Sequence, residues 1–237
     1  MTYRSTGLAI VQRRVVECRR CPRLVDWREL VAERPPPRYA GEEYWGRPVP
    51  SWGDPAARVL VVGLAPAAHG GNRTGRIFTG DRSGDFLFGS LHRTGFANQP
   101  SSVSRGDGLR LRDLYIAATV HCAPPANRPT PQERDACLPY LVQELALLDM
   151  VSVLVALGGF AWDGALRALA ARGDRIVPRP RFGHGAEASV GGLRLIGCFH
   201  PSQQNTFTGR LQPGMMDAVF LRTRELTGLG APDEMHW

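Results

Sequence analysis

Four short apolar runs, separated by stretches with a helical pattern, place the strongest limit on the fold of this chain. The runs lie at 58–63, 114–120, 152–158 and 193–199. Apolar runs of this length, without alternating polar residues, are typical of strands that are buried on both faces. The helical patterns lie near 84–94, 131–148, 160–172 and 214–227. Strands that alternate with helices predict an α/β protein, with a parallel sheet that carries helices on both faces.

The N-terminal part is less regular. Residues 8–33 have a helical pattern that Pro22 is expected to break, and residues 34–57, rich in proline, glycine and aromatic side chains, predict an ordered loop. Thr130 followed by proline predicts the start of the helix at 131–148, because threonine caps helices and proline suits their first position. At the other end, residues 229–237 are expected to form a frayed tail.

The basic residues are all arginine. The chain has 237 residues, 29 Lys and Arg together with no lysine among them, and a formal net charge of +7. The absence of lysine excludes a Schiff base formed by a side chain and a Walker P-loop, whereas arginine binds phosphate through its planar guanidinium. The positive charge suggests an acidic partner, of which nucleic acid is the most usual.

Length and hydropathy predict a single domain at 1–237, without membrane contact. No apolar run reaches the roughly 18 to 20 residues of a membrane span. Residues 1–14 lack the apolar core of a secretory signal, so we expect a cytoplasmic protein. A monomer is the default expectation.

Small and polar residues follow the carboxyl end of every predicted strand. The first strand leads into 63–76, the second into 121–128, the third into Gly158 and Gly159, and the fourth into 200–205. In open α/β sheets, ligands bind at this edge. We therefore expect one cleft to collect His200, Asn127, the segment 63–85 and several arginine side chains.

The cysteines predict a metal centre. Cys18 and Cys21 form a C-x2-C pair, and Cys122 and Cys137 are separated by fourteen residues. Four such thiolates suit either a tetrahedral zinc ion or an iron–sulfur cluster, and the spacing does not distinguish the two. The alternative is a set of inert buried thiols. The fifth cysteine, Cys198, lies within a predicted strand and is expected to be a core residue.

Several of these features resemble the type 5 (class B) uracil-DNA glycosylases. The segments GLAPAAHG at 63–70 and GRIFTGD at 75–81 are similar to the first motif of that family, and HPSQQNT at 200–206 is similar to its final motif. The order and spacing of the four cysteines also resemble the [4Fe-4S] pattern of the family. Together these features extend the resemblance over residues 15–226.

The resemblance implies a three-layer α/β/α fold with a four-stranded parallel sheet. It implies DNA as the partner and hydrolysis of the bond between uracil and its sugar, without a lyase step, which agrees with the absence of lysine. Other deaminated or modified bases, such as hypoxanthine, xanthine and ethenocytosine, are further expected substrates. It also implies that Cys18, Cys21, Cys122 and Cys137 hold a [4Fe-4S] cluster, which would tie the N-terminal helix to the rest of the chain. No nucleotide cofactor is expected, and the DNA partner would place the protein at the nucleoid.

The first motif departs from that of the best-known members of the wider superfamily. Those members carry a water-activating Asp or Asn one residue before the proline, and this chain has Ala65 there. An alanine neither accepts nor orients a proton. By resemblance to the type 5 enzymes, Asp81 becomes the candidate for water activation. Its alternative role is to cap the helix near 84–94, and Asp85 is a weaker rival.

Other candidate roles follow from the chemistry of base removal. His200 would donate a hydrogen bond to the carbonyl oxygen of the leaving base, since preorganised donors stabilise developing charge; otherwise it is a core or capping histidine at a strand end. Phe78 would stack on the extruded base or, alternatively, pack in the core. Asn127 would read a base edge or only form a turn. The small residues Gly63, Ala65 and Ala68 would let backbone amides approach the base.

The remaining candidates concern DNA contacts. Phosphate contacts are expected from Arg73, Arg76, Arg128 and Arg210. Wedge or minor-groove contacts are expected from Gln203, Gln204 and Asn205. The alternative for each is an ordinary solvated side chain. At the level of the whole protein, the alternatives are a non-catalytic metal-containing nucleic-acid-binding module and a nucleoside or nucleotide hydrolase.

Overall fold

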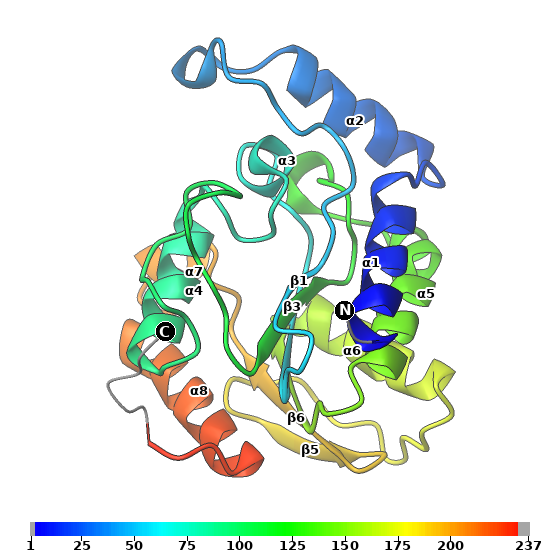
Figure 1. Ribbon diagram of the computed structural model, residues 1–237, viewed down its shortest axis with the longest axis vertical. Coiled ribbons are helices and arrows are strands. Elements are labelled where there is room, and N and C mark those ends of the chain that lie inside the picture. The colour runs from blue at the N-terminus through cyan, green and yellow to red at the C-terminus, as the bar shows by residue number, and fades with distance from the viewer. Residues whose placement is uncertain (1–2, 232–237) are drawn as a thin grey trace.

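The computed structural model describes residues 3–231 and has one six-stranded sheet (Figure 1). Its strands are β1 (Trp52–Gly53), β2 (Val59–Gly63), β3 (Leu114–Ala118), β4 (Val153–Leu157), β5 (Glu187–Val190) and β6 (Leu193–Cys198), in the order β1-β3-β2-β4-β6-β5. The four inner strands pair in parallel, and β1 and β5 add antiparallel edges. The α/β class and the four parallel strands are confirmed, but the total of four strands is wrong. Both extra strands lack a continuous apolar run, because β1 has two residues and β5 is largely exposed.

The helices predicted near 84–94, 131–148, 160–172 and 214–227 lie close to those positions, whereas the short helices at 71–74 and 203–207 were not predicted. The helices are α1 (Tyr3–Val16), α2 (Pro22–Glu33), α3 (Gly71–Thr74), α4 (Arg82–Arg93), α5 (Pro131–Leu147), α6 (Gly159–Ala171), α7 (Gln203–Phe207) and α8 (Pro213–Thr227), with short 3-10 helices at Pro37–Tyr39 and Pro125–Asn127. The predicted break at Pro22 is confirmed, since this residue begins α2. Within residues 3–231, none of these helices is both long and apolar enough to cross a lipid bilayer.

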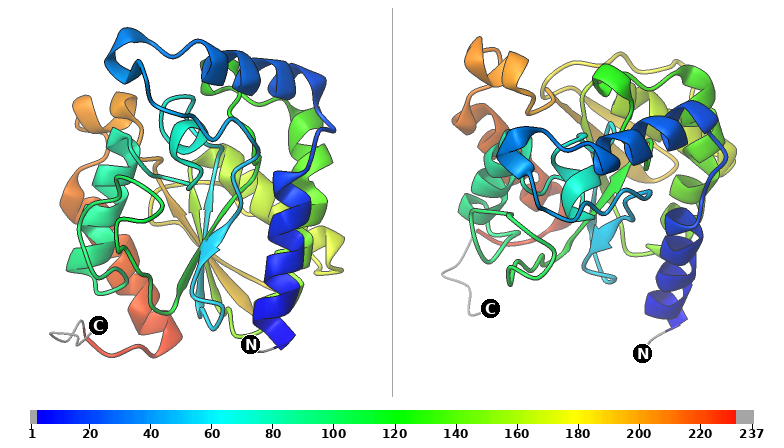
Figure 2. Two further views of the ribbon diagram at one scale, coloured as in Figure 1. Left: turned by 45° about the horizontal axis from the view of Figure 1, so that its top comes forward. Right: turned by 90° about the horizontal axis from the view of Figure 1, so that it is seen from above.

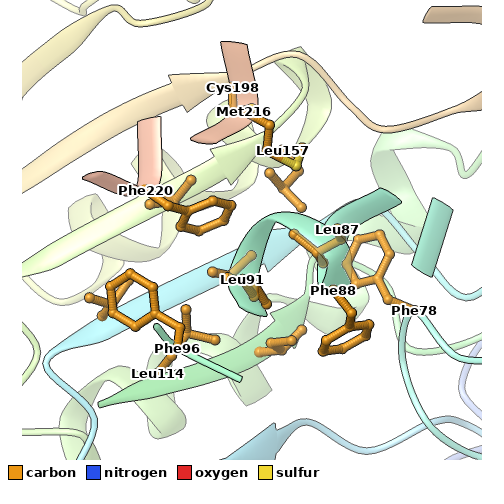
Figure 3. Packing of buried hydrophobic residues seen from close by; sticks show 14 of the residues in the cluster. Phe78, Leu87, Phe88, Leu91, Phe96, Leu114, Leu157, Cys198, Met216 and Phe220 are labelled. Atoms are coloured by element: carbon orange, nitrogen blue, oxygen red, sulfur yellow. The ribbon is translucent and has the colours of Figure 1, made fainter. Parts of the chain in front are cut away.

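Helices cover both faces of the sheet (Figures 1 and 2). Along β2, Val59 and Val61 pack with residues of α4 and α8, whereas Leu60 and Val62 pack with residues of α1, α5 and α6. Figure 3 shows the first of these clusters, in which Phe88 of α4 and Phe220 of α8 meet the sheet. Successive strand residues point to opposite faces, so both sets must be apolar.

Capping side chains begin the two helices that border the carboxyl edge of the sheet. Asp81 accepts a hydrogen bond from the amide of Gly84 at 2.9 Å and caps α4. Thr130 accepts from the amide of Glu133, whose carboxylate accepts from the amide of Thr130 in return. This reciprocal pair is a capping box, and it confirms the start predicted for α5.

The predicted frayed tail is wrong for residues 229–231. Leu229 packs against the core, and the guanidinium of Arg224 donates to the carbonyl oxygens of Gly230 at 2.7 Å and Ala231 at 3.2 Å. The remaining tail residues, 232–237, lie outside the described residues.

One carboxyl group lies inside the core. Glu144 of α5 is fully buried beside the hydroxyl of Ser51, and no hydrogen bond of good geometry reaches either of its carboxylate oxygens within the described part of the chain. Burial raises the pKa of Glu144 to about 8, because the charged form loses its hydration. Near neutral pH, this side chain is therefore held mainly as a neutral acid.

We predict that Glu144→Gln makes the protein more stable than the wild type at pH 9. The pKa of this group is higher in the folded chain than in the unfolded chain. The wild type therefore loses stability as the pH rises toward and through 8, by a few kcal/mol. The amide does not ionise, so the variant should lack this loss. Thermal unfolding at pH 5, 7 and 9 measures it, with the exposed Glu33→Gln as control. An equal pH dependence in both proteins would contradict the assignment.

Candidate active site

A cleft of about 670 Å³ opens at the carboxyl edge of the sheet. Its walls come from segments that are far apart in the chain: 38–39, 67–73, 80–85, Val103, Asn127 and Gln203. Five residues that the sequence assigned to a common site lie here together, namely Ala68, Arg73, Asp81, Asn127 and Gln203. The structure therefore brings Asn127, parts of the segment 63–85 and several arginines to one cleft, whereas His200, which was expected there, does not line it.

Phe78 lies in the hydrophobic core, the alternative given for it from the sequence, and does not line the cleft. Its ring packs with Leu87 and Phe88 of α4, as Figure 3 shows, and it is 7% exposed. A β-carbon at Gly63 would come within 2.9 Å of this ring, so the end of β2 must be glycine for the ring to lie there. Phe78 also has a φ of +56°, a strained conformation for a side chain of this size.

His200 lies next to Phe78 at the end of β6. The two rings are 6.1 Å apart between centroids and inclined by 38°. Asn205 donates to the carbonyl oxygen of His200 at 2.8 Å and holds this turn. Burial lowers the pKa of His200 to about 4, so its imidazole is neutral at pH 7. Neither His200 nor Phe78 is among the residues that line the cleft; the chain links them to it through the lining residues Gln203 and Gly80, which follow three and two positions later.

Asp81 is both a helix cap and a cleft residue. One carboxylate oxygen accepts from Gly84, and the other lies against Gly70, where a β-carbon would overlap it. Burial raises the pKa of Asp81, although hydrogen bonds from nearby amides oppose this shift. Asp85, the rival candidate, also lines the cleft but is exposed. The two roles proposed for Asp81 from the sequence are therefore compatible.

Two of the predicted phosphate ligands have their charges satisfied within the protein. Arg76 is buried and pairs with Asp107 at 2.6 Å, because the loop 99–110 folds over it. The prediction of a phosphate contact for Arg76 is therefore wrong. Arg73 lines the cleft, but it donates to Glu42 at 2.6 Å and to the carbonyl oxygens of His69 and Gly80. Its guanidinium supports the wall of the cleft.

The other side chains that were predicted to contact DNA differ in how exposed they are. Arg128, Arg210, Gln203 and Gln204 are exposed, so their contacts stay predictions. Arg210 stacks on the ring of Phe199 at 4.6 Å. In contrast, the prediction of a wedge role for Asn205 is wrong, because its amide is directed to the backbone of the preceding turn.

The small and turn-forming residues also differ in position. Asn127 lines the cleft and has a φ of +54°, so it is at once a turn residue and a cleft residue. Ala68 lines the cleft as predicted. The predicted contact of Ala65 with the base is not supported, because Ala65 packs against the buried cluster that contains Cys122 and Cys137.

An aromatic wall of the cleft was not predicted from the sequence. The hydroxyl of Tyr44 lies 3.0 Å from Nδ1 of His69, and the ring of Tyr39 lies 5.9 Å from the same imidazole. Arg73 and Arg38 stack on Tyr39 at 4.3 and 4.8 Å. These contacts depend on how an irregular, proline-rich segment folds back over the sheet, and no periodic pattern in the sequence reports this.

The four cysteines of the predicted metal centre come from neighbouring elements. Cys21 begins α2, Cys122 follows β3 and Cys137 lies in α5, and these three share one apolar cluster. Cys18 packs beside Tyr140 of α5. Within residues 3–231, no three His, Cys, Asp or Glu side chains are arranged as ligands of a single metal ion.

Two arginines face these thiols. Arg20 donates to Sγ of Cys18 and Arg28 donates to Sγ of Cys122, each at 3.4 Å. Arg28 is 2% exposed, and its Nε has no hydrogen-bond partner within the described residues. A buried guanidinium is costly unless negative charge lies nearby. Its carboxylate partner among the described residues, Glu29, is at 3.3 Å and well exposed.

Comparisons with known proteins agree with this arrangement. A family model described as the uracil DNA glycosylase superfamily matches residues 50–223. The type-5 uracil-DNA glycosylase of Mycobacterium tuberculosis is 56% identical over 214 residues, covering 90% of this chain and 79% of the relative. The corresponding type-5 protein of Thermus thermophilus is 51% identical over 213 residues, covering 90% and 94%. A type-4 uracil-DNA glycosylase of Thermotoga maritima is 30% identical over 208 residues, covering 85% of each chain.

We predict that Gly70→Ala destabilises the protein by about 1–3 kcal/mol, because the new methyl group overlaps the Asp81 carboxylate and disturbs the cap of α4. Urea unfolding measures the loss. Gly106→Ala is the matched control, since an added β-carbon there meets nothing within 4 Å. Equal stability of the two variants would show that Asp81 is free to move away from Gly70.

Proposed function

The chain belongs to the uracil DNA glycosylase superfamily, and we propose from this membership that it is a base-excision repair glycosylase that hydrolyses the N-glycosidic bond of uracil in DNA. The observation that carries the proposal is the convergence of Asp81 and Asn127 on one cleft, together with the contact between the rings of His200 and Phe78, whose chain segments lead into the lining residues Gln203 and Gly80. The cleft volume lies within the range of about 300–1,000 Å³ that is usual for small-molecule sites.

The base must leave the helix stack before this site can act on it. Extrusion costs a few kcal/mol and is easiest at a mismatched base. Phe78 is suited to receive the extruded base, because its ring is fixed by the core on one side and by the end of β2 on another. Stacking of a base on an aromatic ring contributes about 1–3 kcal/mol, which offsets much of the extrusion cost.

His200 would stabilise the departing base. Cleavage leaves negative charge on the base and positive charge on the sugar, and a neutral imidazole can donate its N–H to the developing oxyanion. Since its pKa is about 4, the imidazole needs no added proton to do this near pH 7. Asn205 holds the backbone of His200, so it acts as a positioning residue.

Asp81 would orient the attacking water and stabilise the sugar cation. The carboxylate oxygen that caps α4 is occupied, and the oxygen beside Gly70 remains for a water molecule in the cleft. Without lysine, no side chain of the protein can form an imine with the abasic sugar, so we propose a monofunctional enzyme. We also propose that hypoxanthine, xanthine and ethenocytosine are substrates.

We propose that Cys18, Cys21, Cys122 and Cys137 hold a [4Fe-4S] cluster. The donor set fits, since the four thiols come from adjacent elements, Cys18 and Cys122 accept hydrogen bonds from Arg20 and Arg28, and thiolates would add negative charge beside buried Arg28. The alternative is a single zinc ion held by the same four thiolates. When bound, the cluster supplies a structural link between α2 and α5.

Further proposals concern the protein as a whole. We propose that its partner is DNA with uracil or another damaged base, that it acts as a single-domain monomer at the nucleoid in the cytoplasm, and that it uses no nucleotide cofactor. The net charge of +7 supports the DNA partner, because it favours association with phosphates.

The test of the activity is a labelled oligonucleotide that contains one uracil. We predict that the wild type releases free uracil and leaves an alkali-labile abasic site, and that His200→Ala lowers the single-turnover rate by about 10²–10³ while still binding DNA. Retention of DNA without cleavage would instead indicate a binding module. Activity on free nucleosides alone would indicate a nucleoside hydrolase. An unchanged rate in His200→Ala would reject the role of the imidazole.

The test of the cluster is spectroscopic. We predict that the purified protein is brown, absorbs broadly near roughly 400 nm and contains about four irons per chain. Cys137→Ser should lose the colour and unfold at a lower temperature, whereas Cys198→Ala should keep the colour, because Cys198 lies in the core beneath α8. Arg28→Met should lower the reduction potential, since it removes a positive charge beside Cys122. Stoichiometric zinc in colourless protein would contradict the proposal.

A further inference from the structure

A second cleft of about 360 Å³ lies next to the first. Residues 43–47 form one wall, Arg73 and Thr74 of α3 form another, and Arg105 of the loop 99–110 closes the third side. Arg73 lines both clefts, and Val103, two residues before Arg105, lines the first. The two clefts are therefore neighbours across a single side chain. None of the functional roles assigned so far uses the second one.

One aromatic ring holds two arginine side chains of this second cleft in position. The guanidinium of Arg105 lies 4.6 Å from the centroid of Trp45, and that of Arg47 lies 5.9 Å from it. Trp45 itself is fixed. Its indole N–H donates to the carbonyl oxygen of Pro48 at 3.0 Å, and its backbone amide donates to the carbonyl oxygen of Arg73 at 2.9 Å. Arginines that stack on a fixed ring lose less freedom when they bind a ligand.

The charge of this cleft is not balanced. Arg47 and Arg105 are exposed, and neither has an ion pair among residues 3–231. Arg73 is neutralised by Glu42 at 2.6 Å, so Glu43 is the single carboxylate in the lining that opposes the two free cations. A site of this kind attracts an anion with several acceptor oxygens, and the planar forks of two arginines suit a phosphate.

We propose that the second cleft binds a phosphodiester of the DNA strand that carries the excised base, with Arg47 and Arg105 as its ligands. The inference rests on the proposed function, and it adds a specific phosphate contact beside the base site. A flanking base is a poorer occupant, because Gly75 and Arg105 already lie against the indole ring of Trp45. A strand that leaves the first cleft past Arg73 brings its next phosphates to these two side chains.

The test combines protein variants with DNA in which one phosphate is neutral. Arg47→Gln, Arg105→Gln and the double variant are compared with the wild type for binding to uracil-containing DNA at several salt concentrations. Each single variant should weaken binding about 10-fold or more, and each should lower the slope of log Kd against log salt by about 0.9. A second set of duplexes carries one methylphosphonate at successive positions around the uracil. One position should weaken the wild type but leave the double variant unaffected.

The matched control is Arg175→Gln. Arg175 is exposed and follows Asp174, which packs against Gly191 at the amino end of β6, the opposite edge of the sheet. The Arg175→Gln variant should retain the wild-type affinity and the wild-type slope of log Kd against log salt. If the wild type does not release uracil at all, the proposed function fails.

If the wild type releases uracil but the double variant keeps its salt slope and its sensitivity to every methylphosphonate, the phosphate site is wrong while the glycosylase assignment stands. The phosphate site would also be wrong if the methylphosphonate weakened binding equally at every position and the variants left the slope of log Kd against log salt unchanged.

Discussion

The parallel pairing of β2, β3, β4 and β6 decides where chemistry can occur in this protein. These strands are buried on both faces, so they hold almost no polar side chain, and polar groups appear where each strand ends. Because all four end at the same edge, residues that are far apart in the chain meet there. Asp81 and Asn127 reach the cleft in this way, and His200 reaches the ring of Phe78.

The rim of this edge is supported by the region of the four cysteines. Arg28 donates to Cys122 through its guanidinium, and its carbonyl oxygen accepts from the side chain of Asn72 at 3.1 Å. Asn72 lies in α3, directly before Arg73, and its own carbonyl oxygen accepts from the amide of Gly46. Helix α2 lies next to α3 in the fold (Figure 2). The thiols and both clefts therefore depend on the same short stretch of backbone, although no cysteine lines either cleft.

Local patterns predicted the elements and the edge at which the site lies. Buried strands, proline and capping residues determine the backbone conformation of residues only a few positions away, so a local pattern is enough to predict their effect. They did not predict β1, which has two residues, or β5, whose side chains are mostly exposed. Arg76 and Asn205 lie within the motifs, yet their side chains point into the protein, and neighbours in the sequence do not determine that direction. The contact of Tyr44 with His69 required the tertiary fold of an irregular segment.

The most direct measurement is a crystal structure of the protein bound to a DNA duplex that contains a non-hydrolysable, 2′-fluorinated deoxyuridine. We expect the uracil outside the helix stack and against the ring of Phe78, with the imidazole of His200 within hydrogen-bond distance of a uracil carbonyl oxygen. A uracil that remains stacked in a bound duplex, or that lies away from the carboxyl edge of the sheet, would contradict the account.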